Sequence, residues 1–192
     1  MLGSIRYCLA RLVDFTGRDA RQTFWYYVLF LALLNVAISM AVTVPMTVDI
    51  AGGAMAAAKS EAQKAAFLAR MNHWFAISVW VSSAASLVIM LLAAAAVVRR
   101  LHDSDHSGWW ILLPVATNLA SIVFSLQTQD RMQRVFESML ANTPGLHQAA
   151  EQQQQTSAYG MIGWIGLIAV FIFGILKPTE GPNRFGDAPV RE

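Results

Sequence analysis

Four stretches of this 192-residue chain contain no Asp, Glu, Lys or Arg: residues 22–48, 71–98, 106–129 and 152–176. Each has an apolar core near or above the roughly 20 residues that a helix needs to cross about 30 Å of hydrocarbon. A continuous apolar run, rather than an alternating one, indicates a helix instead of a barrel strand. The pattern therefore predicts an all-α membrane protein with four transmembrane helices. The expected spans are residues 24–45, 74–98, 109–127 and 158–176.

The composition agrees with this prediction. Hydrophobic residues make up 56% of the chain and charged residues only 14%, whereas ordinary soluble domains have about 25% charged residues. A formal net charge of +2 is too small to indicate nucleic acid as a partner. Cys8 is the single cysteine, which excludes an internal disulfide and leaves the redox compartment open.

The first apolar run has an alternative interpretation as a cleaved signal peptide, with Ser39, Met40 and Ala41 as a small-x-small cleavage site. A signal peptide has a short basic head and an apolar core of about 7–15 residues. Here 23 mostly polar residues precede the apolar run at residues 24–45, which is longer than such a core. The pattern favours a permanent transmembrane helix.

The basic residues predict the orientation of the four helices. Nine of the 14 Lys and Arg lie in residues 1–23, 99–108 and 177–192, and the other five lie in the longer segments 46–73 and 128–157. The positive-inside rule therefore places both termini in the cytoplasm. Tryptophans prefer the membrane–water interface. In this orientation the expected interfacial anchors are Trp25, Trp109 and Trp110 on the inner side and Trp74 on the outer side.

The segment before the first span has a helical hydrophobic pattern. Its apolar residues recur at spacings of three and four, with Arg6 and Arg11 between them: Leu2, Ile5, Leu9, Leu12 and Val13. The pattern is typical of an amphipathic helix on the inner leaflet over residues 1–15. The alternative is a basic tail without regular structure.

The two outer segments, 46–73 and 128–157, also contain helical patterns. Residues 132–140 have an apolar stripe that predicts a continuation of the third helix to a stop at residues 143–145, and residues 54–70 are rich in alanine. We therefore expect a hairpin-like pair of helical extensions outside the membrane. The glutamine-rich residues 151–155 are expected to form a polar connector.

The most charged part of the chain lies between the second and third spans. Residues 99–110 read Arg-Arg-Leu-His-Asp-Ser-Asp-His-Ser-Gly-Trp-Trp and contain six ionisable side chains. Residues 15–25 read Phe-Thr-Gly-Arg-Asp-Ala-Arg-Gln-Thr-Phe-Trp, and residues 181–186 read Gly-Pro-Asn-Arg-Phe-Gly. In this order the three motifs resemble the signatures of a bacterial inner-membrane family, domain-of-unknown-function family 805. The resemblance covers about residues 13–45, 74–127 and 158–189 and implies no established activity.

The predicted topology places all three motifs at the inner face, where their polar residues can form one cluster. The candidate residues are Arg18, Arg21, Arg99, Arg100, His102, Asp103, Asn183 and Arg184. We expect Asp103 to pair with an arginine or to cap backbone groups, because charges near hydrocarbon are costly unless paired or hydrated. Ser107 is expected to cap the third helix.

The sequence supports several functions for this cluster. The favoured one is a non-enzymatic component of the bacterial plasma membrane whose basic cytoplasmic face binds anionic lipid headgroups or a partner, either a membrane protein or a second copy. One alternative is an enzyme acting on a phosphorylated or lipid-linked substrate, with His102 as general base beside Asp103 and Arg99 or Arg100 holding phosphate. A metal site at His102 and His106 and a small transporter or channel are further alternatives. We assign no catalytic, metal or cofactor-binding residue.

Two asparagines interrupt the apolar spans at similar expected depths. Asn35 and Asn118 lie about 14–17 Å from the inner ends of the first and third spans. An amide without a partner in hydrocarbon costs several kcal/mol. We therefore expect both to face the bundle, with each other or a nearby Ser or Thr as partner.

Overall fold

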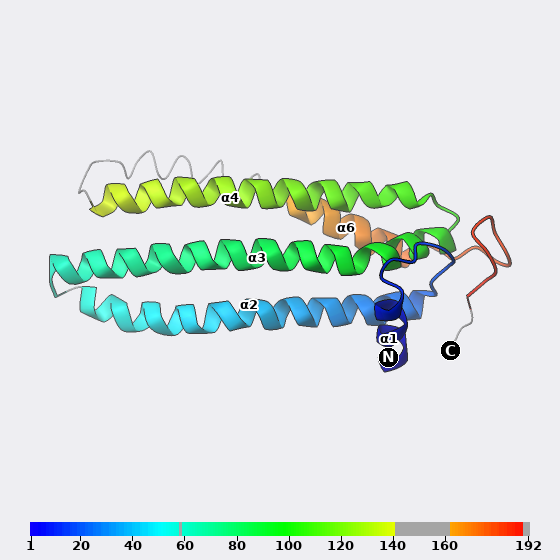
Figure 1. Cartoon of the computed structure of the whole chain (residues 1–192), viewed down its shortest axis with the longest axis horizontal. Helices are drawn as coiled ribbons and strands as arrows, with labels where there is room; N and C mark the ends of the chain where they lie inside the picture. Colours follow the sequence, from blue (N-terminus) through cyan, green and yellow to red (C-terminus); the bar gives the residue numbers. More distant parts are fainter. Residues whose placement is uncertain (58, 141–161, 190–192) are drawn as a thin grey trace. The chain divides into compact units, whose positions relative to one another are not determined.

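The computed structural model describes residues 1–57, 59–140 and 162–189. Figure 1 shows that the regular structure in these residues is helical, and an isolated antiparallel bridge joins Asn183 to Gly186. The predicted all-α class is confirmed. The helices are α1 (Leu2–Ala10), α2 (Arg21–Ala57), α3 (Glu61–Asp103), the short 3-10 helix η1 (Gly108–Ile111), α4 (Leu112–Leu140) and α6 (Ile162–Ile175).

Three of these helical segments are long and apolar enough to cross a membrane: Arg21–Ala54, Glu61–Asp103 and Gly108–Ser138. They contain the first three expected spans. The apolar helix α6 has 14 residues, so it is about 21 Å long and shorter than the hydrocarbon layer. Residues 158–161, where the fourth expected span begins, lie outside the described residues.

The helices extend further than the expected spans, so most of the outer segment 46–73 is helical. The first span was expected to end at Pro45, but α2 continues through this proline to Ala57. A proline removes one backbone donor from a helix, which neighbouring groups can compensate in a membrane protein. Residues 61–73 and 128–140 are also helical, as the sequence suggested. The expected stop at residues 143–145 and the polar connector lie outside the described residues.

The chain divides into two compact units. Unit 1 comprises Met1–Val36, Ser86–Ala120 and Ile162–Glu192, and unit 2 comprises Ala37–Ala85 and Ser121–Met161. In unit 2, Asp49 of α2 pairs with Arg70 of α3 at 3.2 Å and accepts a hydrogen bond from Trp74 Nε1 at 2.8 Å. The expected outer anchor Trp74 therefore also joins two helices.

The core of unit 1 contains residues from α1, α2, α3 and α6. Its buried hydrophobic residues are Cys8, Phe24, Tyr27, Leu31, Ala96, Val97, Leu101, Ala169 and Phe173. Glycines allow α6 to approach its neighbours closely. A Cβ on Gly174 would lie 2.6 Å from the Trp25 ring, and one on Gly166 would lie 2.4 Å from Thr117 Oγ1. Close contact through small residues is the usual way in which membrane helices pack.

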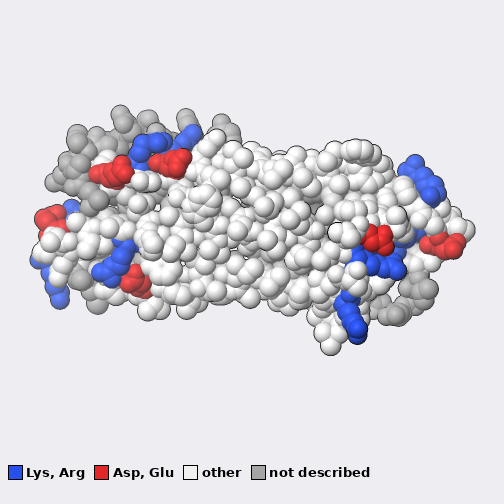
Figure 2. Space-filling model, viewed as in Figure 1, with Lys and Arg blue, Asp and Glu red and all other residues white. Residues whose placement is uncertain are grey.

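The surface of unit 1 has its charges at one end. On the face drawn in Figure 2, the charged side chains at the right lie around the chain termini, and the helical surface next to them is uncharged. Large apolar side chains are exposed along four helices, for example Leu33, Leu91, Leu119 and Leu167. Soluble proteins rarely expose contiguous apolar surface on this scale, which agrees with a lipid environment for these helices.

Candidate functional site

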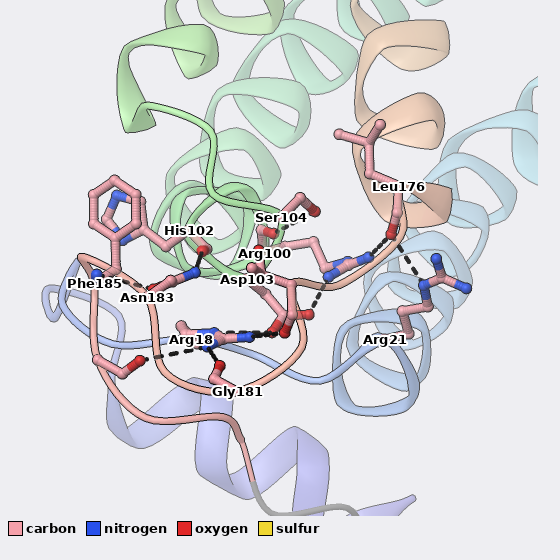
Figure 3. A network of polar contacts seen from close by, with 12 residues as sticks. Arg18, Arg21, Arg100, His102, Asp103, Ser104, Leu176, Gly181, Asn183 and Phe185 are labelled. Carbon is pink, nitrogen blue, oxygen red and sulfur yellow. Dashed lines mark hydrogen bonds and ion pairs between the residues drawn. The ribbon is translucent and has the colours of Figure 1, made fainter.

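Three segments that are distant in the sequence meet where α3 ends in unit 1: residues 14–20, residues 99–105 and residues 176–186 (Figure 3). They include residues of all three motifs that the sequence singled out. Seven of the eight predicted cluster residues make a hydrogen bond or ion pair between these segments or within them, and Arg21, at the start of α2, bonds to Leu176 of the third segment.

Asp103 is held by two arginines. Its Oδ1 accepts a hydrogen bond from Arg18 Nε at 3.1 Å and forms an ion pair with Arg18 Nη2 at 3.0 Å, and its Oδ2 accepts a hydrogen bond from Arg100 Nη1. All three side chains are buried, with Arg100 0% and Asp103 1% exposed. A buried carboxylate between two guanidiniums neutralises part of their charge, which makes the burial of both arginines tolerable. Asp103 thus has the arginine partner expected from the sequence.

Arg100 and Arg21 also donate hydrogen bonds to the backbone carbonyls at the end of α6. Arg100 donates to the carbonyls of Gly174 and Leu176, and Arg21 Nε donates to Leu176 at 3.0 Å. The last carbonyls of a helix have no partner inside the helix and carry the negative end of its dipole. Guanidinium donors at this position provide both hydrogen bonds and favourable charge.

Arg99 joins the N-terminal segment to α3. It pairs with Asp19 at 3.0 Å and donates to the carbonyls of Arg11, just after α1, and Asp14. Burial raises the pKa of the Asp19 carboxyl, although Arg99 acts in the opposite direction. Asp19 Oδ1 and Arg99 Nη2 are buried without a hydrogen-bond partner. The folded N-terminal segment therefore covers Arg99.

The C-terminal segment is fixed mainly through its backbone. Arg18 donates to the carbonyls of Gly181 at 2.7 Å and Thr179 at 2.8 Å, and the Thr179 amide donates to the Asp103 carbonyl at 2.8 Å. Asn183 Nδ2 donates to the His102 carbonyl at 2.9 Å. Gly181 has a φ of +74°, a left-handed conformation that glycine adopts readily. The closing motif is therefore a turn that docks on the end of α3.

His102 is not oriented by Asp103. Its ring stacks on Phe185 with centroids 3.8 Å apart and an interplanar angle of 5°. Its Nδ1 is buried without a hydrogen-bond partner. Because both oxygens of Asp103 accept from arginines, the expected base–carboxylate pair is absent.

His102 and His106 do not share a helix face, because α3 ends at Asp103. His106 Nδ1 lies 2.6 Å from the Ser104 carbonyl instead. Among the described residues, no group of three or more His, Cys, Asp or Glu is arranged to hold a metal ion. The i, i+4 spacing is therefore no basis for a metal site here.

The edge of the site is exposed. Arg184 Nε pairs with Asp105 Oδ1 at 3.0 Å, and both side chains are about half exposed. Ser107 accepts from the Trp109 amide and caps η1, as predicted for the start of the third span. Trp109 and Trp110 are exposed on η1, whereas Trp25 packs edge-on against Phe171.

The sequence missed two acidic residues of the site, Asp19 and Asp105. Asp19 stands directly after Arg18 in the first motif, which is a signal that could have suggested a buried partner for one of the arginines. Asp105 has a φ of 56°, which its short polar side chain tolerates. No comparable signal marks Thr179, because it contributes backbone groups only.

The intramembrane asparagines are not arranged as predicted. Asn118 Oδ1 is buried without a hydrogen-bond partner. Asn35 is exposed, although it lies one turn after the buried Leu31 on the same face of α2. No hydrogen bond joins the two amides, so the prediction that they bond to each other is wrong. The buried Asn118 Oδ1 agrees with the prediction that this amide faces the bundle.

Comparison with protein families identifies the chain. Residues 12–187 match the model of a family described as a protein of unknown function, DUF805. The chain belongs to domain-of-unknown-function family 805. The resemblance of its three motifs is thereby confirmed. No curated protein and no solved structure matches the chain.

Proposed function

We propose that this member of family 805 is a non-enzymatic multi-pass protein of the bacterial inner membrane, with four spans and both termini in the cytoplasm, whose cytoplasmic end binds anionic lipid headgroups. The excess of Lys and Arg in the three inner segments supports this topology. In this proposal α6 forms the inner part of the fourth span.

The lipid-binding proposal rests on one observation. The helix α1 and the turn after it expose apolar side chains and an unpaired cation on one face. Leu2, Arg6, Leu9 and Val13 follow each other at helical spacing and are all exposed, with Leu2 at 83% and Val13 at 88%. The opposite face contributes Cys8 to the core. Arg6 makes no ion pair among the described residues. Apolar side chains beside a free arginine are typical of a helix at an anionic membrane surface.

The buried network supports a non-enzymatic role for the three motifs. Arg99, Arg100 and Asp103 are almost completely buried and bonded to other parts of the chain. A phosphate-binding arginine must instead present free donors to its ligand. The network fixes the N- and C-terminal segments to α3, which holds α1 in place.

The topology is tested with reporter fusions. Fusions after residues 23, 104 and 192 should be cytoplasmic, and those near residues 60 and 150 should be external. A cytoplasmic reporter at either external site would overturn the four-span arrangement.

Lipid binding is tested by native mass spectrometry of the full chain released from vesicles of phosphatidylglycerol and phosphatidylethanolamine. We expect retained phosphatidylglycerol to be enriched, and Arg6→Gln to reduce the enrichment about fivefold, because a basic residue near an anionic surface contributes about 1 kcal/mol. Lys64→Gln, which removes an exposed cation of the outer segment, is the matched control and should change nothing. Retention of the two lipids in their bulk ratio, or turnover of a phosphorylated substrate by the purified protein, would contradict the proposal.

A further inference from the structure

Arg21 is an exposed arginine at the start of α2 whose guanidinium is only partly used by the fold. Its Nε donates to the Leu176 carbonyl at 3.0 Å, and its two terminal nitrogens point away from the polar network (Figure 3). Among the described residues, Arg21 makes no ion pair. A guanidinium has five N–H donors, so those on the two terminal nitrogens are available to a ligand.

The surroundings of Arg21 have an excess of positive charge. Arg100 donates to the same Leu176 carbonyl as Arg21. Asp103 is the buried carboxylate of this group, and it already pairs with both Arg18 and Arg100. Three arginines and one carboxylate leave the end of α6 electropositive, which favours an anion there.

Lys177 adds a further cation directly after α6. It pairs with Glu180 at 3.4 Å, but both side chains are more than 80% exposed. An ion pair in this environment contributes little, so the ammonium group is free to exchange this partner for another anion.

An exposed apolar surface begins next to these cations. Trp25 lies one helical turn after Arg21 and packs edge-on against Phe171 of α6, with ring centroids 5.3 Å apart. Phe171 and Ile175 lie one turn apart on α6 and are 57% and 53% exposed. Cations at the end of an apolar surface match the two parts of a phospholipid, the headgroup and the acyl chain.

We propose that Arg21 and Lys177 hold the phosphate of an anionic phospholipid whose acyl chain lies along Trp25 and Phe171. A guanidinium binds phosphate through charge-assisted hydrogen bonds, often two in parallel. Free phosphate would use the cations alone, whereas a phospholipid also covers the apolar side chains, so we assign the site to a lipid. This inference rests on the proposed function, which places this end of unit 1 at the anionic cytoplasmic leaflet, and it adds a defined site to the exposed face of α1.

Photolabelling of the full chain in vesicles of phosphatidylglycerol and phosphatidylethanolamine tests the site. Each lipid is supplied in turn with a diazirine in its acyl chain, and the labelled residues are mapped by mass spectrometry. We expect the phosphatidylglycerol probe to label residues 171–175 at least about fivefold more than the phosphatidylethanolamine probe, because each basic residue near the surface favours the anionic lipid. Equal labelling of residues 171–175 by the two probes would overturn the proposal.

Two variants test the cations separately. Arg21→Gln and Lys177→Gln should each reduce the preference for phosphatidylglycerol at residues 171–175 about fivefold, and Arg21→Lys, which keeps the charge, should recover part of it. Lys177→Gln changes only an exposed ion pair, so it decides the test if Arg21→Gln fails to fold. An unchanged preference in Lys177→Gln, or in folded Arg21→Gln, would overturn the proposal.

Arg6→Gln is the matched control, because Arg6 is the exposed cation of α1. It should leave the labelling of residues 171–175 unchanged. Retention of phosphatidylglycerol that depends on Arg6, without preferential labelling of residues 171–175, would overturn this site and leave the proposed function intact. Retention of the two lipids in their bulk ratio would overturn both.

Discussion

Replacing Asp103 with asparagine removes the negative charge that Arg18 and Arg100 share. The substitution keeps the size of the side chain and one acceptor oxygen. Its new NH₂ group, however, is a donor that faces a guanidinium, which is also a donor. The variant therefore leaves two buried cations close together and breaks at least one charge-assisted hydrogen bond.

The expected cost follows from the burial of the three groups. The Arg18, Arg100 and Asp103 side chains are each no more than 1% exposed, so water cannot solvate the charges that remain. Removing one partner of a buried ion pair typically costs about 3–5 kcal/mol. Asp19 does not compensate for the loss, because it already pairs with Arg99. We expect Asp103→Asn to lower the free energy of unfolding by about 3–5 kcal/mol.

Reversible denaturant unfolding in detergent micelles, followed by tryptophan fluorescence, measures this change. Asp105→Asn is the matched control. It removes a carboxylate two residues away whose ion pair with Arg184 is half exposed, so its cost should stay below about 1 kcal/mol. The double variant Asp103→Asn/Arg18→Gln should cost less than the sum of the single variants, because the two residues share one interaction.

Similar costs for Asp103→Asn and Asp105→Asn would refute this reasoning. Such a result would mean that water reaches Asp103 and that the network does not hold the three segments together. Additive costs in the double variant would separately contradict the direct contact between Arg18 and Asp103.

Two further predictions concern packing and reactivity in unit 1. Gly166→Ala would place a Cβ 2.4 Å from Thr117 Oγ1 and should lower the free energy of unfolding by about 1–3 kcal/mol. The control is Gly52→Ala, whose Cβ would meet no atom within 4 Å. It should be neutral or stabilising in the same unfolding measurement. Burial raises the pKa of the Cys8 thiol to about 11. Maleimide labelling of Cys8 at pH 8 should therefore be far slower than labelling of Val13→Cys in a Cys8→Ser chain. The labelling of Cys8 should accelerate as the pH rises towards 11. Equal costs for the two glycine variants, or equal labelling rates at pH 8, would contradict these contacts.

Several features were predictable from local sequence. Long runs without charged residues predicted α2, α3 and α4, because a helix satisfies its backbone groups within one segment. Ser107 was predicted as a cap, since capping depends on residues within one turn. The first span was expected to end at Pro45, whereas the helix continues to Ala57.

The candidate site was predictable as a set of residues but not as an arrangement. The sequence identified the motifs that contain Arg18, Asp103 and Asn183. It did not show that Arg99 would be covered by the N-terminal segment, or that His102 would stack on Phe185. These contacts join residues about 80 positions apart, and no local pattern determines which of several carboxylates and carbonyls a given arginine reaches.

The amino-acid sequence by itself determined the helical class, the apolar character of the helices and the family, because hydrophobic run length and short motifs are local properties. Only the tertiary structure decided which charges are buried and which helix faces are exposed. Arg18 meets Asp103 through the packing of three distant segments. Helix rotation and segment docking depend on the fit of all neighbouring side chains at once, which a single stretch of sequence does not contain.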